Sequence, residues 1–181
     1  MENPLEFVKQ HVCNEKLVKH MIAVAAIMRS LAEKFGEDPE KWWLTGLLHD
    51  VDFERTKNDP SRHGIVSAEM LKGLVPEDVL RAIKAHNFEY TGVTPQSKME
   101  KALIAADAVS GLLVACALVM PSKRMEEVRL KTVLKKFKER SFAPTVRRDR
   151  ILFCEQIGLS KEEFLEIALD SLKKVAKELG L

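Results

Sequence analysis

The chain has few cysteines, and they lie far apart. Cys13, Cys116 and Cys154 are the three cysteines among 181 residues, and no Cys-x-x-Cys pair occurs. A thiolate zinc site needs such closely spaced pairs, so the sequence gives no support for one. We interpret the cysteines as buried, reduced thiols of a protein in a reducing compartment, and we predict a cytoplasmic location.

An excess of one charge is also lacking, because 29 Lys and Arg nearly balance 27 Asp and Glu, leaving a formal net charge of +2. This balance gives no overall reason to expect binding to nucleic acid or to a membrane. The first ten residues include acids and no long apolar run, which is not typical of a signal peptide. Hydrophobic residues make up 46% and charged residues 31% of the chain, as in globular proteins, so we predict one domain over residues 1–181.

One apolar stretch, Ala102 to Met120, approaches the length of a membrane span. Asp107 lies within it, and a carboxylate at the centre of a bilayer would cost roughly 2.5–3.5 kcal/mol. A helix that is apolar on all sides also suits the middle of a helical bundle. We therefore predict a buried helix and no membrane association, and Asp107 then needs a partner such as a metal ion.

Strand signals are absent, whereas apolar residues recur every three or four positions. The clearest stripe runs through residues 17–35 and stops at Gly36. Asp38 and Pro39 are typical of the N-cap and first residue of a helix that ends near His49. Residues 54–62 and 91–97 are predicted loops. Further helices are predicted over 63–74, from Pro76 through His86, around 102–120, from Pro144 to Gly158, and after a capping box of Ser160 and Glu163. The sequence predicts an all-α, multi-helix bundle.

Four histidines and two aspartates occupy positions on the interior faces of these helices. They are His20, His49, Asp50, His63, His86 and Asp107. Taken singly, each is explained as a hydrogen-bonded core residue or a helix cap. In one shared core their uncompensated polar groups would be costly, and a common metal ion would satisfy all of them. Imidazole and carboxylate ligands without sulfur suit Mn, Fe, Zn, Co or Ni.

Asp50 has a special position because it directly follows His49. Neighbouring residues of a helix point about 100° apart, so both side chains can bind one ion. The second carboxylate oxygen of Asp50 then remains for another ion. This is the geometry of a bridging ligand in a two-metal site, with ions about 3.5–4 Å apart. We expect one or two divalent ions per chain, with Asp50 and His49 as the catalytic pair.

The order of these residues resembles the HD superfamily of metal-dependent phosphohydrolases. HDVD at 49–52 resembles the HDIG form of the family signature, and HGIVSAEML at 63–71 resembles the helix that follows it. AIKAHN at 82–87 is similar to the next metal-binding helix, and ADAVSG at 106–111 to the segment with the closing aspartate. The likeness covers about residues 16–120, and residues 122–181 are then a C-terminal helical extension.

The resemblance implies specific ligand sets and a reaction. One ion would be held by His20, His49, Asp50 and Asp107, and a second by Asp50, His63 and His86, with Mg added to the candidate metals. The implied reaction is hydrolysis of a phosphomonoester or phosphodiester, of a nucleotide-like molecule, by attack of metal-bound hydroxide. Two alternatives stay open: a di-iron oxygenase of the HD fold, and a non-catalytic metal-binding sensor module.

The sequence departs from the family pattern at two positions. Asn87 stands where many HDIG members have a second histidine, and asparagine is a weaker ligand, so we expect lower affinity for the second ion. Phe53 stands where many members have a lysine. The resemblance therefore suggests that Arg55, Lys57 or Arg62 binds the charge of the substrate instead.

Basic residues outnumber acidic ones between Lys123 and Arg150. They include Lys123, Arg124, Lys131, Lys135, Lys136, Lys138, Arg140, Arg147, Arg148 and Arg150. A solvated helix face explains such a run as well as a function does. The functional interpretation is a positive wall that attracts a small phosphorylated molecule such as a nucleotide, with Arg124 and Arg148 as predicted contacts. The pattern of aromatic residues among these charges does not support a groove for a nucleic-acid single strand, so a nucleic-acid partner is not expected.

Overall fold

The computed structural model describes residues 3–181, and that part of the chain contains helices and turns but no strand. The all-α prediction is confirmed. The α-helices are α1 (Pro4–His11), α2 (Glu15–Phe35), α3 (Pro39–Leu48), α4 (Phe53–Thr56), α5 (Ile65–Leu71), α6 (Glu77–His86), α7 (Phe88–Thr91), α8 (Lys98–Leu118), α9 (Leu130–Lys138), α10 (Arg148–Ile151), α11 (Lys161–Lys174) and α12 (Ala176–Leu179). The 3₁₀ segments are η1 (Pro60–Arg62), η2 (Met125–Glu127) and η3 (Leu152–Ile157).

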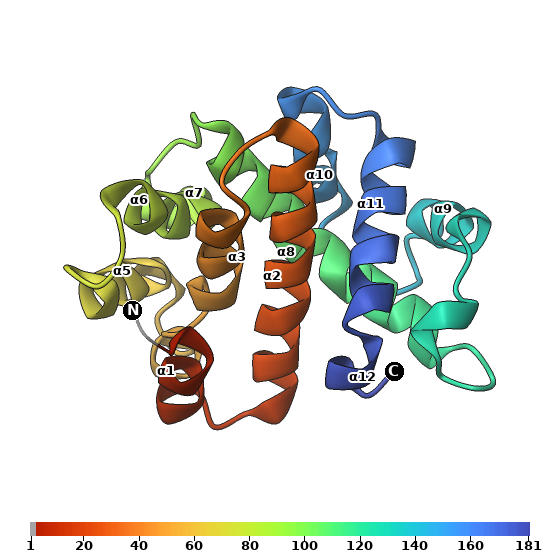
Figure 1. Cartoon of the computed structure of the whole chain (residues 1–181), viewed down its shortest axis with the longest axis horizontal. Helices are drawn as coiled ribbons and strands as arrows, with labels where there is room; N and C mark the ends of the chain where they lie inside the picture. Colours follow the sequence, from red (N-terminus) through yellow and green to blue (C-terminus); the bar gives the residue numbers. More distant parts are fainter. Residues whose placement is uncertain (1–2) are drawn as a thin grey trace.

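Helix α2 lies at the centre of the molecule. Helix α3 packs along one side of it, α11 packs along the other, and α8 crosses behind (Figure 1). Helices α5, α6 and α7 gather beside α3, whereas α9, α11 and α12 lie on the side of α2 away from α3. The predicted ligands lie on α2, α6 and α8, just after α3 and just before α5; α3 and α8 pack on each other, and each packs on both α2 and α6.

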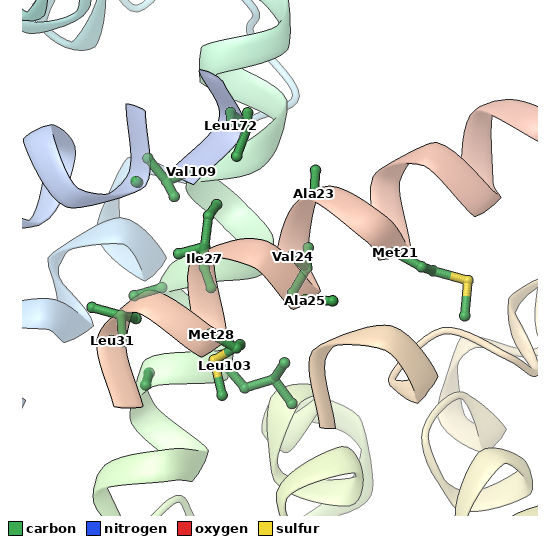
Figure 2. Packing of buried hydrophobic residues seen from close by; sticks show 14 of the residues in the cluster. Met21, Ala23, Val24, Ala25, Ile27, Met28, Leu31, Leu103, Val109 and Leu172 are labelled. Atoms are coloured by element: carbon green, nitrogen blue, oxygen red, sulfur yellow. The ribbon is translucent and has the colours of Figure 1, made fainter. Parts of the chain in front are cut away.

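Apolar side chains of α2 fill the space between its neighbours. Ile27 and Met28 are fully buried, and Figure 2 shows them near Leu103 of α8 and below Leu172 of α11. Fully burying one such side chain stabilises the fold by about 1.5–3 kcal/mol. The stripe predicted over residues 17–35 is thus the face through which α2 packs on the other long helix, α8, and on α11.

Two helix boundaries fall where the turn residues predicted them. Gly36 ends α2 with a left-handed φ of 68°, a conformation that glycine adopts without steric cost. Asp38 caps α3 by accepting hydrogen bonds from the amides of Glu40 and Lys41, and Pro39 is the first helical residue. These caps fix where α3 begins and hence where its C-terminal end lies.

Other predicted boundaries are wrong. The predicted loops at 54–62 and 91–97 contain short helical turns: α4 overlaps the start of the first, η1 lies at its end, and α7 reaches the start of the second. The helix predicted to start at Pro144 begins only at Arg148, because the residues before it form a loop that the Arg148 side chain holds in a non-helical shape. The Arg148 guanidinium donates hydrogen bonds to the carbonyl oxygens of Ala143 at 2.6 Å and Val146 at 2.9 Å, which holds that loop together.

Side-chain environments also differ from expectation in places. Ser160 accepts from the amide of Glu163 at 3.2 Å, but the Glu163 carboxylate pairs with Lys34 at 2.6 Å, so only half of the predicted capping box forms. Cys116 and Cys154 are buried as predicted, whereas Cys13 is exposed. Cys13 lies in the turn between α1 and α2, where its backbone amide donates to the Glu54 carboxylate and its side chain is exposed.

Helix α8 is long and apolar enough, by length and composition alone, to cross a membrane. Most of it is buried by neighbouring helices, among them α2, α6 and α10. A capping box of Ser97 and Glu100, which is not among the predicted capping signals, starts this helix. The packing favours the interpretation of α8 as the core helix of a bundle, and it places Asp107 among the other predicted ligands.

Candidate metal centre

The C-terminal end of α3 presents the first two predicted ligands. Gly46 allows α3 to approach α2 closely, because a Cβ at this position would lie 2.8 Å from Cα of Ala25. His49 follows three residues later, and its Nδ1–H donates to the Gly46 carbonyl oxygen at 2.8 Å. The His49 imidazole is fully buried, and its Nε2 has no hydrogen-bond partner among residues 3–181. An unpaired buried nitrogen is costly, so its position suits coordination of a metal ion.

Asp50 lies where the predicted histidine ligands converge. Its Oδ1 is close to three Nε2 atoms, those of His63 at 3.2 Å, His49 at 3.3 Å and His86 at 3.5 Å. Its Oδ2 lies 3.6 Å from Nε2 of His20. The carboxylate is thus surrounded by ligand atoms on two sides, as a bridging ligand requires.

Hydrogen bonds on Nδ1 aim the other nitrogen of each ring at Asp50. His86, at the end of α6, repeats the arrangement of His49, since its Nδ1–H donates to the carbonyl of Ile83, three residues earlier. His20 donates from Nδ1 to the hydroxyl of Ser110 at 3.0 Å, and that hydroxyl in turn donates to a backbone carbonyl of α8. Because Nδ1 carries the hydrogen, the Nε2 lone pair of the neutral ring can bind a metal ion. Nε2 of His86 lies 3.0 Å from Nε2 of His63, so an ion there would replace a hydrogen bond between the two rings.

Asp52, the last residue of the HDVD segment, holds His63 in place. Its buried carboxylate accepts from His63 Nδ1–H at 2.8 Å and from the amides of Gly64 at 2.9 Å and Ser67 at 2.8 Å. Burial alone would raise the pKa of Asp52, but these donors lower it below its usual value. The turn needs glycine at residue 64, where φ is 85° and a Cβ would lie 2.9 Å from the carbonyl oxygen of Ile83.

The carboxylates and imidazoles of the centre shift each other's pKa. Burial alone would lower the pKa of His49 and His63, but the nearby carboxylates raise it to about 9 and about 10. Burial would likewise raise the pKa of Asp50, yet the facing histidines hold it well below its usual value. For His86, burial lowers the pKa and keeps the ring neutral. The carboxylates are therefore ionised at neutral pH, as metal ligands must be.

The predicted ligands form two overlapping groups that share Asp50. In each group the ligand atoms lie within 4.8 Å of one another; the groups are His20, His49 and Asp50, and Asp50, His63 and His86. Asp107 extends the first group, because its Oδ1 lies 3.2 Å from Nε2 of His20 and 3.8 Å from Nε2 of His49. The structure thus brings all six predicted ligands together, and this set of imidazoles and carboxylates fits a divalent metal ion.

The centre has a buried floor and is most exposed at His20 and Asp107, which we call its open side. His49 and His86 are almost completely buried, whereas the side chains of His20 and Asp107 are 26% and 23% exposed. A molecule that approaches the centre therefore meets His20 and Asp107 first.

None of the five residues predicted to bind substrate forms a salt bridge with a predicted metal ligand within residues 3–181. Arg55 and Lys57 are exposed and form no salt bridge within the described part of the chain. Arg62 and Arg124 each pair with a nearby glutamate, at 3.2 Å and 3.6 Å. Arg148 is buried and binds backbone carbonyls, which accounts for its guanidinium without a substrate. Roles in substrate binding stay predictions for these residues.

Two positions that depart from the family pattern have clear environments. Asn87 faces the loop before α5, where its Nδ2 donates to the carbonyl oxygens of Pro60 at 2.9 Å and His63 at 3.0 Å. It therefore supports the loop that carries His63. Phe53 is 46% exposed, and its ring meets the His63 ring edge-on with centroids 5.5 Å apart.

Sequence reasoning missed three residues that act on the predicted ligands. Asp52 and Ser110 lie inside segments already matched to the family, so their places in those segments were a usable signal. Arg150 had no such signal, because it is one of many charges in a basic run. In the structure its Nη1 lies 3.9 Å from Oδ2 of Asp107.

Comparisons with known proteins agree with this geometry. The HD domain family model matches residues 17–112. An uncharacterised protein of Methanocaldococcus jannaschii is 31% identical over 173 residues, which cover 88% of this chain and 98% of that protein. Ribonuclease Y of Thermotoga petrophila is 25% identical over 176 residues, which cover 91% of this chain but 33% of that protein. Ribonuclease Y of Lawsonia intracellularis is 30% identical over 98 residues, 54% of this chain and 18% of that protein. No solved structure matches significantly. The chain belongs to the HD domain family.

Proposed function

We propose that this protein is a divalent-metal-dependent phosphohydrolase that acts on a phosphate ester. The observation that carries the proposal is the convergence of four histidine Nε2 atoms on the two oxygens of Asp50. Membership of the HD domain family, whose members are generally metal-dependent phosphohydrolases, supports the same reaction class. We propose two ions per chain, one in each group of ligands, drawn from Mn, Fe, Zn, Co, Ni and Mg.

Bound divalent ions supply an activated water and offset the negative charge that develops on phosphoryl oxygens. The chain contributes fixed positions for its own groups. The Nδ1 hydrogen bonds hold the rings of His49, His63 and His86 before substrate arrives, so little reorganisation accompanies the reaction. The buried floor excludes bulk water, which strengthens each electrostatic interaction above it.

The substrate we propose is a nucleotide-like phosphomonoester or phosphodiester. Phe53 supports this choice, because its exposed ring beside His63 offers a planar base a surface for stacking. The relatives named ribonuclease Y point to the same kind of phosphate chemistry, although the chain spans about a third of the Thermotoga protein. We further propose a small phosphorylated substrate, since the net charge of +2 gives no strong attraction to nucleic acid or membranes. We also propose a cytoplasmic location, as expected for a protein with free, buried thiols such as Cys116 and Cys154.

The test begins with the metal content of the purified protein and a screen of phosphate esters with Mn²⁺ added. We expect two divalent ions per chain at saturating metal, and phosphate release that stops with excess chelator. The screen should pair p-nitrophenyl phosphate with its bis-ester and nucleoside monophosphates with cyclic ones. Bound iron with O₂ uptake and no phosphate release would favour a di-iron oxygenase. Metal binding without any turnover would favour a sensor module.

A further inference from the structure

Arg150 of α10 reaches the open side of the metal centre. Its Nη1 lies 3.9 Å from Oδ2 of Asp107, whereas the other oxygen of Asp107 faces Nε2 of His20 at 3.2 Å. Within residues 3–181 it is the one lysine or arginine whose nitrogen comes within 4.0 Å of a carboxylate of the six predicted ligands. The segment after residue 112, beyond the matched family model, thus adds a cation to the centre.

Contacts with α7 hold the Arg150 guanidinium in this place. Its Nη2 donates to the Glu89 carboxylate, and its Cζ lies 5.6 Å from the centre of the Phe88 ring. The side chain is only 13% exposed, which limits its freedom to move through solvent. Glu89 and Phe88 follow shortly after His86, so the same short stretch of chain positions a predicted metal ligand and the anchor of Arg150.

The hydrogen-bond donors of Arg150 are only partly used. A guanidinium carries five N–H groups in a planar fork, and here Nη2 is occupied by Glu89. Nη1 forms no hydrogen bond within the described residues, and 3.9 Å from Asp107 is too long for one. Nη1 therefore lies beside Asp107, on the open side of the centre, with its donors unused. The guanidinium fork matches the oxygens of phosphate.

We propose that Arg150 binds a non-ester oxygen of the substrate's phosphoryl group and favours phosphomonoesters over diesters. The inference rests on the proposed function and names its substrate class. A phosphomonoester has three non-ester oxygens and a second negative charge, whereas a diester has two such oxygens and one charge. If the metal ions occupy two non-ester oxygens, only a monoester has a third one left for Arg150. Arg150 should therefore favour monoesters.

Arg147 provides a matched control. It pairs with the same carboxylate, Glu89, at 3.0 Å, but its other partner is Asp149 at 2.5 Å and its side chain is 55% exposed. Arg147 therefore shares the anchor of Arg150 without approaching Asp107. If Arg150 served only to neutralise Glu89, removal of either arginine would have the same effect.

The experiment measures binding of inorganic phosphate to the Mn²⁺-loaded protein by calorimetry. It compares the wild type with Arg150→Met, Arg150→Lys and Arg147→Met, with a melting curve and a Mn²⁺ titration for each. Arg150→Met should weaken phosphate binding about 10- to 100-fold, the range expected for a charge-assisted hydrogen bond, and Arg150→Lys less. Arg147→Met should change it by less than about twofold, and Mn²⁺ affinity should be unchanged throughout. The ratio of kcat/KM for monoester over diester should fall in Arg150→Met only.

Several results would overturn the assignment: no phosphate binding in the wild type, equal binding in Arg150→Met, or a loss of Mn²⁺ affinity in Arg150→Met that parallels the loss of phosphate. The last would make Arg150 a positioning residue for Asp107. Phosphate binding that depends on Arg150 in a protein that hydrolyses no ester would support Arg150 as an anion-binding residue while contradicting the proposed function. The two failures are therefore distinguishable.

Discussion

The two halves of the metal centre differ in what holds their ligands. In the inner site, which we define as Asp50, His63 and His86, the imidazoles donate to the ionised carboxylate of Asp52 and to a backbone carbonyl. In the outer site, His20, His49, Asp50 and Asp107, the His20 ring is held by a serine hydroxyl and is 26% exposed. His49 and His86 are held alike, so the sites differ at His63, which an ionised carboxylate orients and which is 15% exposed, and at His20, which is more exposed and more weakly held. The inner site is thus the more preorganised of the two, whereas the outer site is more open and adjoins Arg150. We infer that the inner site fixes its ion and that the outer site receives the substrate.

The largest difference between the two sites should appear when one ligand of the inner site is removed. His63→Asn leaves two protein ligands in the inner site, whereas His20→Asn leaves three in the outer site. His63→Asn should therefore lower the metal content by one ion and turnover by more than about a hundredfold, the scale of one lost electrostatic contact in an active site. His20→Asn should retain its ion at saturating metal. His11→Asn, which changes a histidine of α1 outside the centre, is the control. Equal metal losses in His63→Asn and His20→Asn would remove the distinction between the sites.

The second prediction compares Asp52 and Ser110, which accept the Nδ1 hydrogen bonds of His63 and His20. Asp52→Asn removes the charge that orients His63, and loss of such a partner typically lowers metal affinity about 10- to 100-fold. Ser110→Ala removes the neutral partner of His20 and should lower affinity at the outer site by less. Metal titrations of both variants measure the difference. A larger loss in Ser110→Ala would reverse our account of which site is preorganised.

Metal uptake should release protons. The pKa values of about 9 for His49 and about 10 for His63 keep both rings protonated in the metal-free protein at pH 7.5, and coordination needs the neutral form. Because these folded-state values lie above the usual 6.5, the stability that the two ion pairs contribute is full below about pH 6.5 and is lost as pH rises through 9–10. Calorimetry in buffers of different ionisation enthalpy should detect up to two protons released per chain. A heat independent of the buffer would contradict this.

The smallest expected effect concerns Asn87. Because its amide supports the loop that carries His63, Asn87→His should loosen the inner site a few-fold and lower the free energy of unfolding by about 1–3 kcal/mol. Asn58→His, at an exposed loop position nearby, is the control. Tighter metal binding in Asn87→His would show that residue 87 can act as an additional ligand, as in many HDIG relatives.

The sequence alone predicted those structural features that depend on neighbouring residues or on a repeating apolar pattern. The apolar stripe of α2 and the capping residues of α3 report on contacts within one or two turns, so their boundaries were correct. The order of the histidines and aspartates predicted the ligands that the structure brings together. Arg148 and Arg150 could not be distinguished, because they differ only in which way α10 turns each side chain. One binds backbone carbonyls, and the other reaches Asp107 from a distant part of the chain.

The central claim is that Asp50 bridges the two sites, and one comparison tests it most directly. Asp50→Asn keeps the size of the side chain and removes its charge, and its metal content should be measured with turnover on the same preparation. A wild-type melting curve in excess chelator accompanies it, because loss of metal also removes binding energy from the folded state. We predict that Asp50→Asn loses occupancy at both sites and that phosphate-ester hydrolysis is abolished. Two ions bound with wild-type affinity, and hydrolysis at the wild-type rate, would contradict the bridging role and the two-metal phosphohydrolase that depends on it.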